Sequence, residues 1–339
     1  KILLTAGLID QLGTPPMKLE IIILAAGQGT RMKSPLPKVL HQVAGRPMLQ
    51  HVVDSARELG AAAIHVVVGH GAADVEQALA GQALNWVVQE QQLGTGHAVL
   101  QAMPAVDADS IVLVLYGDVP LIRPDTLQAL VEKAQDSPAL LTARVADPSG
   151  YGRILRASDG SVLGVVEHKD ASPEQRLINE MNTGVLAAPA ADLNAYLPAV
   201  GNANSQGEYY LPDILAMAVA EGKTVAAQLA SSELEVLGVN DRLQLNQVER
   251  EFQLRLAQQL LRDGVSIADP SRLDIRGTLN CGADVSIDVN VLVEGQVSLA
   301  DGVSIGPNCV LKNVSVAAGA TIHAMSHLED AVVGESANV

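Results

Sequence analysis

The chain has 339 residues, which is too long for one ordinary core. Of these residues 48% are hydrophobic and 18% charged, a composition that excludes a disordered protein. Its formal net charge of −16, without a stripe of Lys or Arg, argues against a nucleic-acid partner. No apolar run approaches the ~20 residues needed to cross a bilayer, and the two cysteines lack metal-site spacing, so we expect a cytoplasmic protein without membrane contact.

Residues 1–16 are interpreted as a leader or a vector-derived extension, because Met17 directly precedes a strong strand pattern. Residues 19–25 form a continuous aliphatic run that ends in the turn Ala26-Gly27-Gln28-Gly29. A buried strand followed by a glycine turn is typical of the start of a nucleotide-binding α/β unit.

Strand and helix patterns then alternate as far as residue 134. We predict strands at 64–68, 86–88 and 111–115, and helices at 48–59, 75–79, 96–103 and 126–134. This order predicts a mostly parallel sheet with helices on both faces. In such a sheet the ligand binds beyond the carboxyl ends of the strands.

The pattern changes after residue 139. Residues 140–188 carry shorter strands and turns, and we interpret them as an inserted β-rich segment that covers one side of the ligand pocket; residues 213–220 return to helix. Residues 243–263 predict a long connecting helix, because apolar side chains recur at steps of three and four: Leu245, Val248, Phe252, Leu256 and Leu260.

The last part of the chain carries an internal repeat. Aliphatic residues recur at six-residue steps: Ile287, Val293, Leu299, Ile305 and Leu311. After one slip of the register the six-residue spacing continues from Val316. This period predicts a β-solenoid, whereas the alternative, a β-sandwich, does not keep so strict a count. Since the repeat still runs at Val339, we expect a truncated solenoid.

The first candidate site is the glycine turn, with the residues Leu24, Ala25, Ala26 and Gly27, together with the basic residues Arg31 and Lys38 that follow. Glycine lets the backbone approach a phosphate, and the two cations can neutralise it. The turn is neither a complete dinucleotide fingerprint nor a Walker loop, and its glycines alone would fit an ordinary strand-to-helix turn.

Two further motifs follow strands. Tyr116-Gly117-Asp118 ends an aliphatic run, and its carboxylate can hold Mg²⁺, although a lone Asp there is often a turn former or a helix cap. The stretch from Gln89 to Gly94-Thr95 offers amide and backbone groups that can bind a base edge. We interpret His97 as a packed or capping histidine and assign it no catalytic role.

Taken in order, these motifs resemble the signature of sugar-nucleotide pyrophosphorylases. From Met17 to Val339 the chain is similar to the bacterial bifunctional N-acetylglucosamine-1-phosphate uridylyltransferase / glucosamine-1-phosphate N-acetyltransferase family. The resemblance implies a Rossmann-like nucleotidyltransferase domain at 17–242, a linker helix at 243–263 and a left-handed parallel β-helix at 264–339 that forms homotrimers. In that family acetyl transfer uses later coils, so we expect this chain to lack it.

The resemblance also implies a reaction and its residues. UMP would pass from UTP to N-acetylglucosamine-1-phosphate, giving UDP-N-acetylglucosamine and pyrophosphate for cell-wall and lipopolysaccharide precursors. The cofactor would be Mg²⁺, held by Asp118 and Asn240, with Arg31, Lys38 and Asp118 catalytic. The nucleotide-binding set is Leu24, Ala25, Ala26, Gly27, Lys38, Gln89, Gly94 and Thr95. The sugar-binding set is Tyr116, Gly117, Asp118, Gly152, Glu167, Asn182 and Asn240; without the resemblance Gly152, Glu167 and Asn182 would each be a turn or a solvated polar residue, and Asn240 a helix cap.

Three alternatives stay open from the residues alone. The first is a related enzyme with another sugar or base, such as a glucose-1-phosphate nucleotidyltransferase. The second is a non-catalytic regulatory subunit, which would be expected to lose charged site residues such as Lys38 and Asp118. The third is a nicotinamide dehydrogenase, which the incomplete glycine fingerprint disfavours.

Overall fold

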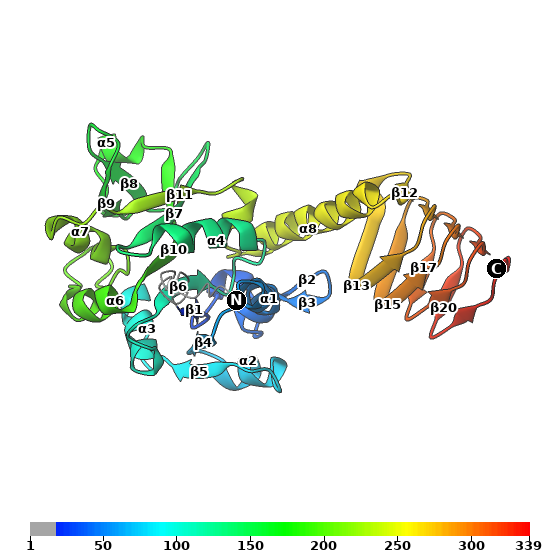
Figure 1. Ribbon diagram of the computed structural model, residues 1–339, viewed down its shortest axis with the longest axis horizontal. Helices are drawn as coiled ribbons and strands as arrows, with labels where there is room; N and C mark the ends of the chain where they lie inside the picture. The colour runs from blue at the N-terminus through cyan, green and yellow to red at the C-terminus, as the bar shows by residue number, and fades with distance from the viewer. Residues whose placement is uncertain (1–17) are drawn as a thin grey trace, which may run out of the picture.

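A computed structural model describes residues 18–339, which form an α/β part and a coil of parallel strands joined by the helix α8 (Arg242–Arg262), as Figure 1 shows. The predicted leader, residues 1–16, lies outside the described residues. The connecting helix predicted at 243–263 is confirmed as α8. Among the described helices, none is both long and apolar enough to cross a bilayer.

A nine-stranded sheet forms the centre of the α/β part, in the order β11-β7-β10-β6-β1-β4-β5, with β8 paired to β10 and β9 paired to β8. The predicted aliphatic strands lie in its middle and pair in parallel: β1 (Leu19–Leu24), β4 (Ala63–Val68) and β6 (Ile111–Tyr116). Only β10 (Glu180–Pro189) runs against its neighbours on that path. The other strands are β5 (Asn85–Val88), β7 (Ala139–Arg144), β8 (Arg153–Arg156), β9 (Val162–Val166) and β11 (Ala226–Leu229).

Helices cover both faces of this sheet, as predicted. Ile21 and Ile23 of β1 pack in one apolar cluster and Ile22 in the other, because successive side chains of a strand point to opposite faces. The first cluster includes α1 (Met48–Glu58), α2 (Ala72–Ala78) and α4 (Pro124–Lys133). The second includes α3 (Thr95–Ala102), α6 (Ala190–Tyr196) and α7 (Asp213–Ala220).

The interpretation of residues 140–188 as an insert is wrong in one respect. Strands β7 and β10 lie on the main path of the central sheet, and only the β8–β9 hairpin lies off that path, attached through the pairing of β8 with β10. The short helix α5 (Pro173–Arg176) follows the hairpin in the chain. The sequence pattern gave the strands but not their partners, since short runs do not reveal which sheet a strand joins. A small hairpin of β2 (Gln42–Val43) and β3 (Arg46–Pro47) was not predicted.

The coil beyond α8 confirms the solenoid, because its strand pairs are all parallel, whereas a sandwich would carry antiparallel hairpins. Leu273 pairs with Val291, 18 residues later, so one turn takes three six-residue steps. Leu299 pairs with Val316, only 17 residues later, which is the predicted slip. The next turn is shortened as well, because Val316 pairs with Val333, so the prediction of a single slip is wrong. The left hand of the coil stays a prediction.

Two sheets make up this coil. The first contains β12 (Ser266–Ile267), β14 (Ser286–Ile287), β16 (Ser304–Ile305) and β19 (Thr321–Ile322). The second contains β13 (Leu273–Cys281), β15 (Val291–Leu299), β17 (Val310–Lys312), β18 (Ser315–Val316), β20 (His327–Glu329) and β21 (Val332–Val333). The aliphatic residues of the repeat point inward and form a separate apolar cluster.

Candidate active site

The predicted site residues gather where three parallel strands end. Leu24 and Tyr116 are the last residues of β1 and β6, and Gln89 directly follows β5. The turns are tied to neighbouring strands: Gly117 N donates to Leu24 O at 2.9 Å, and Gln89 N donates to Val68 O at 2.8 Å. The site therefore lies at the carboxyl edge of the sheet, as the strand order predicts.

A cavity of about 320 Å³ opens at this edge. The whole predicted nucleotide-binding set lines it: Leu24, Ala25, Ala26, Gly27, Lys38, Gln89, Gly94 and Thr95. Tyr116 and Asp118 line it too, with four residues to which no role was assigned: Val39, Gln92, Ala98 and Glu208. The volume is within the range of sites for small ligands.

The glycine turn closes directly against Lys38. Gly29 has φ 63°, and a Cβ built on it would lie 2.6 Å from the Cβ of Lys38, so a larger residue could not hold this turn. Gly27 differs, because a Cβ there would meet no atom within 4 Å and would project into open space beside the cavity. Glycine at 27 thus leaves the backbone accessible to a ligand.

Three of the predicted residues meet at one point. Lys38 Nζ donates to Asp118 Oδ2 and, at 3.3 Å, to Asn240 Oδ1. Lys38 comes from the 3-10 turn Lys38–Leu40, Asp118 follows β6, and Asn240 precedes α8. The side chains of Lys38 and Asp118 are only 14% and 15% exposed, which strengthens the ion pair relative to one in open water.

The residues at this point fit a magnesium ion. Asp118 and Asn240 direct a carboxylate and an amide oxygen to the same cation, the ammonium of Lys38, and such oxygens are the ligands that Mg²⁺ prefers. Among residues 18–339 no group of three or more His, Cys, Asp or Glu side chains could hold a metal by itself. A pair of oxygen ligands suits an ion whose other ligands are water and phosphate.

Gln89 lies in a fixed orientation on the far side of the cavity. It is 3% exposed, and its Nε2 donates to Gly94 O at 3.2 Å and approaches His97 Nδ1 at 2.9 Å. The imidazole of His97 thus helps to fix the side-chain amide of Gln89. This structural role agrees with the prediction of a packed histidine. Oε1 of Gln89 has no donor among residues 18–339 and can accept one from a base edge.

Gly94 allows the loop after Gln89 to lie against a second segment. At φ 110° its Cβ would lie 2.6 Å from Tyr209 O, and Gly96 N donates to the same oxygen at 2.8 Å. We expect Gly94→Ala to weaken nucleotide binding about fivefold and to lower the melting temperature, because alanine must move the backbone. Calorimetric titration and thermal unfolding measure both, with Gly201→Ala as a control, since a Cβ on Gly201 meets nothing within 4 Å. Wild-type affinity in Gly94→Ala would contradict this.

A second cavity of about 220 Å³ adjoins the first, and the two share the lining residues Thr95, Tyr116 and Glu208. Four residues of the predicted sugar-binding set line the second cavity: Tyr116, Gly152, Glu167 and Asn182. Asn182 N donates to Gly152 O at 2.8 Å, and Asn182 Oδ1 accepts from Gly184 N at 3.1 Å. These bonds join the loop before β8 to β10 and fix the orientation of the Asn182 amide.

Negative groups surround the second cavity. Burial, and then the carboxylates of Asp213, Asp170 and Glu208, raise the pKa of Glu167 above its ordinary value. Burial also raises the pKa of Tyr116, with smaller contributions from Asp118 and Glu167. The phenol of Tyr116 therefore stays protonated at neutral pH and can donate a hydrogen bond.

Three predicted residues do not line either cavity. Gly117 is buried beneath the site, where a Cβ would lie 3.1 Å from Leu49, and Arg31 is exposed on the turn Thr30–Met32. Asn240 joins the site only through its contact with Lys38. Of the residues without an assigned role, Gln92 donates to Ala26 O at 2.6 Å. Its place in the polar stretch after Gln89 was the available signal. Glu208 lies in the stretch 206–211, which resembles the family's sequence but to which no role was assigned, and the fold brings it from this distant segment.

Comparisons with known proteins agree with this geometry. Residues 21–185 match the MobA-like NTP transferase domain. A nucleotidyl transferase from Methanothermobacter thermautotroptrophicus has a similar fold, with a TM-score of 0.50 and 24% identity over 70% of this chain and 99% of that one. A UDP-glucose pyrophosphorylase in complex with UDP-glucose has a TM-score of 0.53 and 21% identity over 63% of this chain and 90% of its own. At these identities the two structures support the fold alone.

Closer similarity is found to curated bacterial proteins. The bifunctional protein GlmU of Pseudomonas putida (strain GB-1) is 55% identical over 323 residues, 95% of this chain and 71% of its own length. GlmU of Stutzerimonas stutzeri (strain A1501) has the same identity and the same two coverages. GlmU of Burkholderia thailandensis is 53% identical over 93% of this chain and 70% of its own length. With such identity over most of both chains, the protein belongs to the GlmU family of nucleotidyltransferases.

Proposed function

We propose that the protein transfers UMP from UTP to N-acetylglucosamine-1-phosphate, forming UDP-N-acetylglucosamine and pyrophosphate with the help of Mg²⁺. The observation that supports this most directly is the convergence of Lys38, Asp118 and Asn240 beside two adjoining cavities. A basic side chain and two oxygen ligands at one point are what the reaction of two phosphate groups requires.

In the proposed step, a phosphate oxygen of N-acetylglucosamine-1-phosphate attacks the α-phosphorus of UTP. The new P–O bond forms as the bond from the α-phosphorus to the oxygen that bridges to the β-phosphate breaks. The electron pair of the broken bond leaves with pyrophosphate. The step needs neither a redox partner nor a covalent enzyme intermediate, so the protein contributes orientation and neutralisation of charge.

Lys38 is proposed to stabilise the charge that develops on the reacting phosphates, because its ammonium lies at the cavity wall with limited exposure. Asp118 and Asn240 would hold Mg²⁺, which when bound supplies further neutralisation of phosphate charge. Arg31 is assigned to the departing pyrophosphate by family resemblance, and because its side chain is exposed this role stays a prediction.

The two ends of the product are proposed to occupy the two cavities. Gln89, Gly94 and Thr95 would bind uracil in the first, where Gln89 offers an acceptor oxygen. Glu167, Asn182 and Gly152 would bind the sugar in the second, where a carboxylate suits a hydroxyl group and an amide suits the N-acetyl group. We also propose, from the resemblance to this family, that the protein is a cytoplasmic homotrimer. The proposed domain boundaries on the same basis are 17–242, 243–263 and 264–339.

Release of pyrophosphate from a panel of nucleoside triphosphates and sugar-1-phosphates, with and without Mg²⁺, tests the proposal. We expect UTP with N-acetylglucosamine-1-phosphate to be the best pair by at least tenfold in kcat/KM, and omission of Mg²⁺ to abolish release. A preference for glucose-1-phosphate, or for another nucleotide, would support the related enzyme that the sequence left open. Release that is independent of metal would contradict the role of Asp118 and Asn240.

A further inference from the structure

Helix α8 is in contact with both chain segments that carry the central ion pair. Its side chains reach the β2–β3 hairpin, which begins four residues after Lys38, and the loop that follows Asp118. At its amino end the helix begins two residues after Asn240, with Asp241 as its N-cap. One rigid element therefore contacts the surroundings of all three residues that meet at the candidate metal site.

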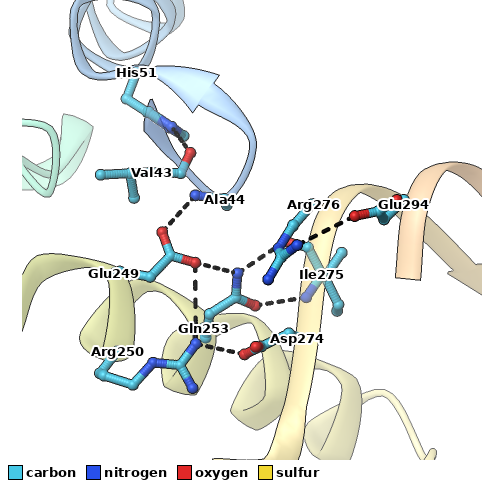
Figure 2. A network of polar contacts seen from close by, with 10 residues as sticks. All are labelled: Val43, Ala44, His51, Glu249, Arg250, Gln253, Asp274, Ile275, Arg276 and Glu294. Carbon is cyan, nitrogen blue, oxygen red and sulfur yellow. Dashed lines mark hydrogen bonds and ion pairs between the residues drawn. The ribbon is translucent and has the colours of Figure 1, made fainter. Parts of the chain in front are cut away.

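Glu249 makes the contact with the hairpin (Figure 2). Its Oε2 accepts a hydrogen bond from Ala44 N at 2.7 Å, and its Oε1 accepts one from Gln253 Nε2 at 2.9 Å. Ala44 is buried at the hairpin tip with φ 50°, so its amide would lose water without gaining a protein partner if Glu249 were absent. A hydrogen bond to a charged acceptor at a buried amide is among the stronger ones.

The hairpin is held from two other sides. His51 Nε2 donates to Val43 O at 2.9 Å, since a carbonyl can only accept, and a Cβ on Gly45 would lie 3.2 Å from Cβ of Arg276 on β13. The hairpin tip thus lies between α1, α8 and strand β13 of the coil. His41 lies in the chain between Lys38 and the hairpin, and its main chain is bonded to the residues before and after the hairpin. Its N donates to Lys38 O, and its O accepts from Met48 N, the first residue of α1.

Arg255 makes the contact with the other segment. Its Nη1 donates to Leu121 O at 3.0 Å, three residues after Asp118, and Val239 N donates to Asp118 O at 2.9 Å just before the helix. Glu249 and Arg255 thus bond main-chain atoms of the segments that carry Lys38 and Asp118 respectively. Neither side chain lines the two cavities of the site.

We propose that Glu249 and Arg255 are positioning residues of the nucleotidyl transfer, which fix the distance between Lys38 and Asp118 from the side of α8. This inference rests on the proposed function and adds residues outside the ligand-binding set. Catalysis by preorganised charges depends on such distances, since a displacement of about 1 Å can reduce turnover by up to about a hundredfold. The connecting helix is then part of the catalytic scaffold as well as a link to the coil.

Steady-state kinetics of Glu249→Ala and Arg255→Ala in the full chain test the inference, with Arg262→Ala as the matched control. Arg262 is an exposed arginine in the last turn of the same helix and, among residues 18–339, has no hydrogen bond or ion pair to the hairpin or to the loop after Asp118, whereas Arg250 is unsuitable because its Nη2 lies 4.0 Å from Glu249 Oε1. We expect kcat to fall about tenfold in the two test variants and to stay near wild type in the control. KM for the sugar phosphate should change less than about twofold in all three, because the second cavity is untouched.

Two further measurements separate positioning from a loss of stability. Glu249→Gln retains an acceptor for Ala44 N and should restore most of the activity, and Glu249→Ala should cost little extra in a Lys38→Ala background. Hydrogen exchange of residues 38–47 should rise in Glu249→Ala and not in Arg262→Ala. Unchanged kcat in both test variants, or equal losses in Arg262→Ala, would overturn the inference. If the wild type released no pyrophosphate, the proposed function would fail, and exchange at 38–47 would still decide whether Glu249 holds this segment.

Discussion

Replacing Asp118 by alanine should lower kcat by at least two orders of magnitude, a loss of about 2.7 kcal/mol or more at the transition state. The carboxylate of Asp118 accepts from Lys38 beside the carbonyl oxygen of Asn240, and both side chains of the ion pair are largely buried. Alanine removes a metal ligand and leaves the Lys38 ammonium without its counter-ion, so two sources of charge stabilisation are disturbed together.

Asp125→Ala is the control for this experiment. Asp125 is an exposed acid that pairs with Arg123 at the start of α4, away from the two cavities, and its loss should leave turnover near wild type. Initial rates across a Mg²⁺ titration, with thermal unfolding of each variant, give the comparison. Turnover of Asp118→Ala within about fivefold of wild type would remove Asp118 from the proposed chemistry.

The parts of the fold that could be predicted are those governed by local pattern. The aliphatic runs of β1, β4 and β6 are buried on both faces, so they are hydrophobic at successive positions and recognisable without tertiary information. The coil was predictable for a similar reason, because its turns of 18 or 17 residues place aliphatic side chains inward at steps of six residues, shortened once in the 17-residue turns. Its parallel pairing decides against the sandwich.

Pairing between distant segments was not predictable in this way. Residues 140–188 were expected to form an insert, yet β7 and β10 complete the central sheet, because the partner of a short strand is set by topology and not by its own residues. Glu208 reaches both cavities only because Tyr209 N and O bond the loop at 93–96. The same holds for Glu249 and Arg255, whose polar side chains on a helix resemble an ordinary solvated face.

Within the candidate site, too, local sequence pattern predicted the positions of some residues and not of others. The nucleotide-binding set lies on strand ends and the turns next to them, and all eight residues line one cavity. Arg31 is close to that set in sequence but exposed in the structure, so proximity along the chain did not determine its position. Membership of the GlmU family of nucleotidyltransferases decides against the dehydrogenase and the non-catalytic subunit, while sugar and base identity depend on the substrate panel.

Glu167→Gln should weaken the sugar site while making the unliganded protein more stable at neutral pH. Under the proposed function a charged acceptor for a sugar hydroxyl is lost, so KM for the sugar phosphate should rise about ten- to hundredfold, with a smaller change in KM for the nucleotide. Kinetics with each substrate varied in turn measure this separation. Equal increases in both constants would contradict the assignment of Glu167 to the second cavity.

The gain in stability follows from the direction of the pKa shift. Burial and the carboxylates of Asp213, Asp170 and Glu208 raise the pKa of Glu167 above the ordinary 4.5, so the folded protein binds this proton more tightly than the unfolded chain does. The contribution of Glu167 to stability is therefore most favourable below pH 4.5 and declines as the pH rises through its folded pKa. Glutamine is neutral throughout and removes this decline.

Thermal unfolding of both proteins between pH 4.5 and 7.5 tests the sign. The melting temperature of Glu167→Gln should exceed that of wild type by an amount that grows with pH across this range. Glu174→Gln is the control, and its effect on stability should have the opposite dependence on pH. Ser172 and the local backbone lower the pKa of the exposed Glu174 carboxyl, whereas the pKa of Glu167 is raised. A difference for Glu167→Gln that is independent of pH would show that its carboxylate is not destabilised in the fold. If it grows as expected, the sugar site keeps its acid at the expense of stability, as binding sites for polar ligands commonly do.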